Sequence, residues 1–241
     1  MGQGTVRCER HDTAEASEFR VMEVPEELIP AIRRSGFDEL DGGGWAKTFP
    51  AEAPHLDRAW QNFQRLVEPW LRQVAGLDPV PWQEALELVC RRLTDARVDW
   101  WLTGSGALAV RGVAVTPGDL DLVVAAEDAC RVGDLLLDGL IEPVTRVDWF
   151  CEWWGRAVLG ARVEWVGGVG PASDEPEPTD FGLAAAAALE TVRWRGWDVR
   201  IPPLELQRAV SARRELVERV RLIDDHPAGS AVRSSDGSGP E

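Results

Sequence analysis

Short apolar strands and helices alternate from residue 82 onward, and this alternation limits the possible folds more than any other feature. Residues 82–95 carry apolar side chains at helical spacing, and the run VDWWLT at 98–103 predicts a buried strand. A short helix at 105–111 and an alternating strand at 119–125 follow. Chains with this alternation form α/β or α+β domains. We therefore expect one main domain of that kind.

The remaining C-terminal segments continue the pattern. A helix is expected at 127–138, and two or three antiparallel strands between 146 and 166 with a turn at Gly160. A loop rich in Gly, Pro and acids at 167–180 precedes an alanine-rich helix at 181–194 and a short strand at 197–201. Pro202 and Pro203 then open a last helix that reaches about residue 223.

The first 80 residues form a separate pattern. We expect a short helix at 24–35, a hairpin around the turn at 41–44, and a helix at 57–75 that Pro69 kinks or breaks. A connector after Gly76 places a boundary near residue 78. The expected organisation is a disordered tail at 1–20, an N-terminal α/β appendage at 21–78, the core at 79–180, a C-terminal helical segment at 181–223 and a disordered tail at 224–241.

Composition excludes several classes of protein. The 241 residues carry a net charge of −15, which argues against a nucleic-acid binder because such proteins need a basic surface. No apolar run approaches the ~18 residues of a membrane helix, and no secretory signal is visible, so we expect a cytoplasmic protein.

Lys47 is the only lysine, and tyrosine is absent, which suggests a GC-rich bacterial genome. The four cysteines have no zinc-ligand spacing and are expected to be free thiols.

One candidate site lies where the strand at 98–103 runs into Gly104 and Ser105 at a helix start. Free backbone N–H groups, a hydroxyl and the positive helix end together favour phosphate binding, and glycine lets a phosphate approach the backbone closely. The alternative is that Ser105 serves only as a helix N-cap.

Two aspartates stand at a spacing of two in the next strand. Asp119 and Asp121 share one face of that strand, about 7 Å apart, while Leu120 and Leu122 face the core. A divalent cation would offset their repulsion, and magnesium takes carboxylate oxygens together with substrate phosphates. The alternative is a solvated strand face with two surface aspartates.

A third acid, Glu164, is isolated in the apolar run RVEWV. Charged residues are rarely buried unless they are paired or bound to metal, so Glu164 is a candidate third ligand. The alternative is an edge-strand glutamate that faces water or pairs with Arg162 or Arg156.

Together these segments resemble the polymerase-β-like nucleotidyltransferase superfamily. The matching stretches read LTGSGALAVRG, PGDLDLVV and ARVEWVG, within residues 82–166. The wider pattern resembles bacterial antibiotic nucleotidyltransferases and abortive-infection-type nucleotidyltransferase toxins. The resemblance implies an α+β nucleotidyltransferase fold with a mixed sheet flanked by helices.

The resemblance also implies site residues. Gly104 and Ser105 would hold nucleotide phosphates, and Asp119 and Asp121 would bind Mg²⁺ with Glu164 as third acid. Asp148 and Glu152 on a neighbouring strand stay open as alternatives to Glu164. Arg208 and Arg213 in the last helix are candidates for binding the triphosphate.

The implied activity is transfer of an NMP from an NTP to a hydroxyl of a small-molecule acceptor, with release of pyrophosphate. Magnesium would bridge the phosphates and activate the acceptor hydroxyl, for which Glu164 could be the general base. Two alternatives stay open. One is a toxin-like nucleotidyltransferase that acts on tRNA or protein, and the other is a non-catalytic nucleotide-binding or interaction module of the same fold.

Overall fold

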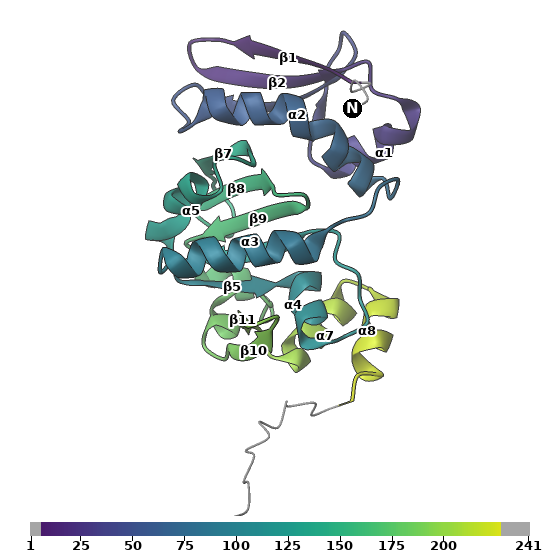
Figure 1. Ribbon diagram of the computed structural model, residues 1–241, viewed down its shortest axis with the longest axis vertical. Helices are drawn as coiled ribbons and strands as arrows, with labels where there is room; N and C mark the ends of the chain where they lie inside the picture. Colours follow the sequence, from purple (N-terminus) through teal and green to yellow (C-terminus); the bar gives the residue numbers. More distant parts are fainter. Residues whose placement is uncertain (1–5, 228–241) are drawn as a thin grey trace, which may run out of the picture.

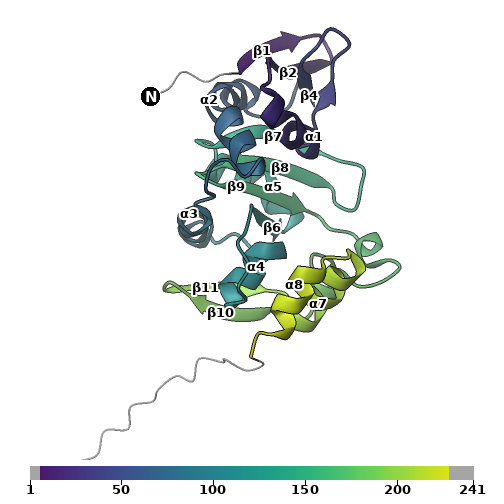
Figure 2. The ribbon, with the colours of Figure 1, turned by 90° about the vertical axis from the view of Figure 1, so that its right-hand side faces the viewer.

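The computed structural model describes residues 6–227 and stacks three tiers along its long axis (Figures 1 and 2). The strands are β1 (Arg7–Asp12), β2 (Ala16–Met22), β3 (Asp38–Glu39), β4 (Trp45–Pro50), β5 (Trp100–Thr103), β6 (Leu120–Val124), β7 (Leu140–Arg146), β8 (Trp153–Val158), β9 (Arg162–Gly167), β10 (Glu190–Trp194) and β11 (Trp197–Ile201). The α-helices are α1 (Ile29–Arg34), α2 (Leu56–Val74), α3 (Trp82–Asp95), α4 (Gly104–Arg111), α5 (Ala129–Leu135), α6 (Leu183–Ala186), α7 (Leu204–Arg213) and α8 (Val217–Asp224). Short 3₁₀ helices are η1 (Glu26–Leu28), η2 (Ala126–Asp128) and η3 (Pro171–Asp174).

The middle tier is a five-stranded sheet in the order β5-β6-β9-β8-β7. Only β6 and β9 pair in parallel, and the other neighbours are antiparallel. The expected α+β class with a mixed sheet flanked by helices is thus confirmed. After β6 the chain crosses through α5, forms β7 and β8, and returns with β9 beside β6. The indole N–H of Trp165 in β9 donates to the carbonyl of Ala129 at 3.0 Å, which fixes α5 on one face of the sheet.

The upper tier is an antiparallel sheet, β1-β2-β4-β3, that packs on α1 and α2. Helix α2 buries Phe63 and Trp70 completely, and Phe63 contacts Phe19 of β2 with ring centroids 5.4 Å apart. Its Asn62 side chain donates to the carbonyls of Leu137 and Leu140, at 2.8 and 2.9 Å, next to edge strand β7. One continuous apolar core therefore joins the upper tier to the middle sheet.

The prediction of a disordered tail over residues 1–20 is wrong for the described part of that segment. Strands β1 and β2 pair antiparallel from Arg7 to Met22. The signal is weak because β1 is an edge strand of mostly polar residues, as edge strands often are. In β2, however, Phe19 and Val21 are fully buried and alternate with half-buried residues. This period of two spans few residues, and it gains its stability from pairing with β4.

The predicted helix at 181–194 is also wrong over most of its length. Only Leu183–Ala186 is helical, whereas Glu190–Trp194 forms a hairpin with β11. Arg195 and Gly196 both have positive φ, as a two-residue turn matched to strand twist requires. Trp194 then stacks on Trp82 of α3, with ring centroids 5.8 Å apart. Packing against α3 thus favours the strand over the alanine-rich local preference.

Several other predicted helices and strands form, with their ends at slightly different residues. The hairpin of β3 and β4 and the helices α3 and α4 form where the sequence predicts them. Pro69 lies inside α2 without ending it. The expected last helix is instead two helices, α7 and α8, separated at Glu215, which has a φ of 55°. The tail predicted from residue 224 lies mostly outside the described residues. Within residues 6–227, no helix combines the length and apolarity that a bilayer crossing requires.

Candidate active site

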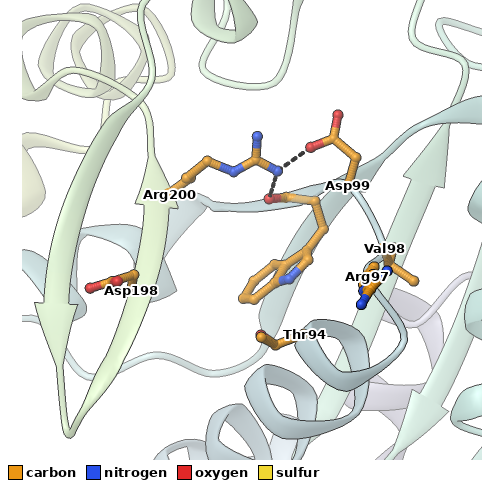
Figure 3. A pocket seen from close by; sticks show the side chains of 7 residues that line it. Thr94, Arg97, Val98, Asp99, Asp198 and Arg200 are labelled. Atoms are coloured by element: carbon orange, nitrogen blue, oxygen red, sulfur yellow. Dashed lines mark hydrogen bonds and ion pairs between the residues drawn. The ribbon is translucent and has the colours of Figure 1, made fainter.

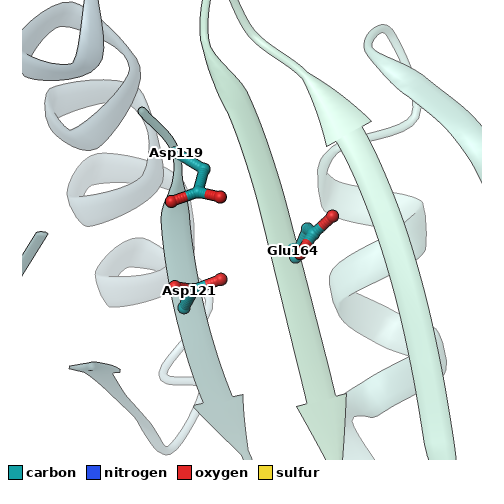
Figure 4. Close-up of side chains that lie close together, drawn as sticks. All are labelled: Asp119, Asp121 and Glu164. Carbon is teal, nitrogen blue, oxygen red and sulfur yellow. The ribbon is translucent and has the colours of Figure 1, made fainter. Parts of the chain in front are cut away.

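Three carboxylates meet at the junction of β6 and β9. Oxygens of Asp119, Asp121 and Glu164 all lie within 4.8 Å of one another. Asp119 and Asp121 come from one strand and its N-terminal extension, and Glu164 from the neighbouring strand (Figure 4). The parallel register places Asp121 directly opposite Glu164, so the predicted adjacency of these strands is confirmed. Neither Asp148 nor Glu152 belongs to this cluster.

Arginines neutralise two of the three acids. Arg162 is ion-paired with Asp119. Glu164 accepts a hydrogen bond from Nε of Arg156 at 2.5 Å, and Nε of Arg162 lies 3.5 Å from it. The pairing of Glu164 with arginines, expected as an alternative to the cluster, thus occurs together with it.

Among residues 6–227, Asp121 has no such direct partner. Burial raises the pKa of its carboxyl to about 7, and the negative charges of Glu164 and Asp180 add to the effect, while Arg214 and Arg219 oppose it. A converging set of hard oxygen donors with excess negative charge suits a divalent cation such as Mg²⁺. The residues present therefore fit a metal at this position.

The acids face a cavity of about 650 Å³, a size common for small-molecule sites. Gly104 and the three acids are among the residues that line it. Apolar and aromatic side chains line much of the rest. These are Leu122, Val123, Trp149, Phe150, Trp154, Trp165, Val166, Phe181 and Val210. Trp149, Phe150 and Phe181 form a row of ring contacts, with centroids 4.2 and 4.9 Å apart, and the Trp149 residue is 73% exposed.

Gly104 is required at the start of α4. Its φ is +63°, and a Cβ there would lie 2.7 Å from Oδ2 of Asp121. The absence of a side chain thus lets the Asp121 carboxylate approach the helix terminus. Ser105, only 9% exposed, does not line the cavity, so its predicted role in phosphate binding stays a prediction.

The two arginines proposed from the sequence have different environments. Arg213 lines the cavity and pairs with Glu177 at 2.8 Å. Arg208 pairs with Asp224 of α8 at 2.5 Å and does not line the cavity. Arg214, which the sequence analysis missed, lines the cavity beside Arg213.

Asp180 is a second missed residue. It lines the cavity, and its backbone carbonyl accepts a hydrogen bond from the Thr103 hydroxyl at 2.6 Å. Burial raises the pKa of its carboxyl above the ordinary range. Its segment had only the composition of a loop, so no periodic signal could have placed it beside β5.

A smaller cavity of about 310 Å³ lies between the end of α3 and β11 (Figure 3). Three of its four charged lining residues are already paired: Arg200 bonds Asp99, and Asp198 pairs with Arg193 at 2.8 Å. These internal pairs leave it less suited than the larger cavity to a charged substrate.

Comparisons with known proteins give structural likeness only. No protein-family profile matches the chain, and no curated protein matches it. The solved lincosamide antibiotic adenylyltransferase LnuA, bound to lincomycin, is similar over 61% of this chain and 99% of its own, with 11% identity and a TM-score of 0.46. A protein of Thermotoga maritima described as a candidate nucleotidyltransferase is similar over 59% of this chain and 89% of its own, with 20% identity and a TM-score of 0.45. The antibiotic-resistance factor ANT(2'')-Ia is similar over 58% of this chain and 83% of its own, with 15% identity and a TM-score of 0.40.

Proposed function

We propose that the protein is a magnesium-dependent nucleotidyltransferase that moves an NMP from an NTP to a hydroxyl of a small-molecule acceptor and releases pyrophosphate. One observation carries this proposal. Three carboxylates from two parallel neighbouring strands converge within 4.8 Å and face a cavity. Burial and the neighbouring acids disfavour the negative charge of Asp121, and a bound cation would stabilise it.

The chemistry divides among the chain's own groups. Asp119 and Asp121 would hold Mg²⁺, and Glu164 would complete the ligand set. When bound, magnesium supplies neutralisation of phosphate charge and a lowered pKa for the acceptor hydroxyl. Glu164 would take the hydroxyl proton as general base. The acceptor oxygen then forms a bond to the α-phosphorus while the bond to pyrophosphate breaks, and Arg213 and Arg214 supply positive charge for the phosphates.

The cavity lining favours a small acceptor with apolar or aromatic surface. Trp149, Phe150 and Phe181 offer ring faces and edges. Two acids of the neighbouring loop are engaged within the chain. Asp174 accepts hydrogen bonds from the backbone of Thr179 and Ala184, both at 2.8 Å. Glu177 pairs with Arg213, so only part of the negative charge of this loop is left for a polycationic acceptor.

A tRNA or protein acceptor is the second candidate, and the net charge of −15 weighs against tRNA. A non-catalytic module is the third, and the intact acidic cluster weighs against it. A cytoplasmic location in a bacterium stays a prediction from the sequence.

The test is a thermal-shift screen of each NTP with and without Mg²⁺. A shift that requires both supports the proposal, while no shift with any NTP contradicts it and favours the interaction module. The matched variant is Asp119→Asn/Asp121→Asn, which should abolish the joint shift and still unfold cooperatively. An unchanged joint shift in this variant would contradict the assignment of the two ligands.

A further inference from the structure

A row of polar side chains crosses the whole middle sheet. In the register, Thr103 lies opposite Asp121, and Asp121 opposite Glu164. Glu164 in turn lies opposite Arg156, and Arg156 opposite Glu142 of β7. Directly paired residues point to the same face of a sheet. The row therefore extends from the cavity to the edge strand that faces the N-terminal tier.

The N-terminal tier completes the row. Nζ of Lys47, from β4, lies 2.8 Å from Oε1 of Glu142. Aromatic rings of the same tier cover the cations: Arg156 lies 5.0 Å from the ring centroid of Trp70, and Lys47 lies 5.1 Å from that of Phe37. The charged groups thus alternate in sign from Lys47 through Glu142 and Arg156 to Glu164.

Lys47, Glu142 and Arg156 form the closed half of the row, which is largely sealed from solvent. The side chains of Lys47, Glu142 and Arg156 are 11%, 7% and 8% exposed. Arg156 is shared, since Nη1 bonds Glu142 while Nε donates to Glu164. Lys47 supplies the second positive charge that Glu142 needs at this depth. Without Lys47, Glu142 would draw the Arg156 guanidinium toward itself and away from Glu164.

We propose that Lys47, Glu142 and Arg156 are positioning residues that hold the Glu164 carboxylate for the metal, so that the N-terminal tier is part of the active centre. This inference rests on the proposed function, because it concerns the metal site of that function. It gives a role to a domain that the sequence analysis left without one.

A pair of variants separates positioning from general stability. Lys47→Met should weaken Mg²⁺ binding about tenfold, the low end of what loss of outer-shell support costs. Adding Glu142→Gln removes the carboxylate that competes for Arg156, so Lys47→Met/Glu142→Gln should regain affinity toward the wild-type value. The control is Arg92→Met, which breaks a partly buried pair with Asp138 away from the row and should leave Mg²⁺ affinity unchanged. Isothermal titration with Mg²⁺ alone gives all four affinities.

The single lysine provides an independent readout. In protein labelled with ¹³C and ¹⁵N lysine, one side-chain signal reports on Lys47. We expect that signal to shift during a Mg²⁺ titration and to saturate with the calorimetric affinity. If the wild-type protein binds Mg²⁺ but the signal does not move, or Lys47→Met binds Mg²⁺ as tightly as wild type, the positioning role is overturned and the proposed function is not. If the wild-type protein binds no Mg²⁺, the proposed function fails and this inference fails with it.

Discussion

Asp121 and Glu142 are acids of the same row in one sheet, yet their pKa values shift in opposite directions. Burial opposes the charged form of both. For Glu142, Arg156 and Lys47 more than offset burial, and the pKa falls below its ordinary value. Asp121 faces Glu164 and Asp180 instead, and its pKa rises to about 7. The closed half of the row is therefore satisfied by the protein itself, whereas the half at the cavity is left to be satisfied by a ligand.

The largest expected effect on stability comes from removing the cation of the closed half of the row. Arg156→Met leaves Glu142 and Glu164 buried without their shared cation, which should cost about 3–5 kcal/mol of unfolding free energy. Urea unfolding measures the loss. Arg92→Met, which removes a more exposed pair with Asp138, should cost far less. Equal losses of unfolding free energy in the two variants would mean that leaving Glu142 and Glu164 without Arg156 costs no more than breaking an exposed ion pair.

At the cavity, removing a charge is expected to raise the unfolding free energy instead of lowering it. Asp121→Asn removes a charge that the fold disfavours, so the metal-free protein should gain about 4 kcal/mol at pH 8. Since the folded pKa of Asp121 lies above that of the unfolded chain, wild-type stability should fall as pH rises from about 4 to 7. The variant should lack this part of the pH dependence. Thermal unfolding across that range, without metal, tests both points, and a destabilised variant would contradict the pKa assignment.

A comparison of two glycines tests whether the close approach of the Asp121 carboxylate to the backbone matters for Mg²⁺ binding. Gly104→Ala and Gly76→Ala both place a side chain at positive φ, +63° and +74°, and each should cost about 1 kcal/mol. A Cβ at Gly76 meets nothing within 4 Å, whereas at Gly104 it meets the Asp121 carboxylate. Only Gly104→Ala should therefore also weaken Mg²⁺ binding in calorimetry. Equal Mg²⁺ affinity in the two variants would show that the close approach is dispensable.

The smallest effect on stability is expected at the cavity mouth. Trp149→Ala should change unfolding free energy by less than about 0.5 kcal/mol, because the residue is 73% exposed. If the ring stacks on a ligand, nucleotide or acceptor affinity should nevertheless fall several-fold. Titration of Mg²⁺ with each NTP checks this, with Leu77→Ala, another exposed apolar residue, as the control. Unchanged affinity for every NTP would exclude Trp149 from nucleotide binding.

The acidic cluster could be predicted from the sequence because its signals are local. Asp119 and Asp121 share a strand with clear alternation, and Glu164 interrupts an apolar run. The continuation of the row could not be predicted. Glu142 precedes the segment expected to be strand, and Lys47 lies in a different tier 95 positions earlier, so only strand register and domain docking bring them together. Asp180 and Arg214 were missed for the same reason, since no local pattern indicates which loop or helix end closes a cavity.

The ion pair between Arg162 and Asp119 changes how a metal can enter. Under the proposed function, the Arg162 guanidinium would have to leave the Asp119 carboxylate before Mg²⁺ could bind there. The displaced Arg162 would then need a new anionic partner, which a triphosphate would supply. Metal and nucleotide are therefore expected to enter cooperatively, with each binding more weakly alone than in the presence of the other.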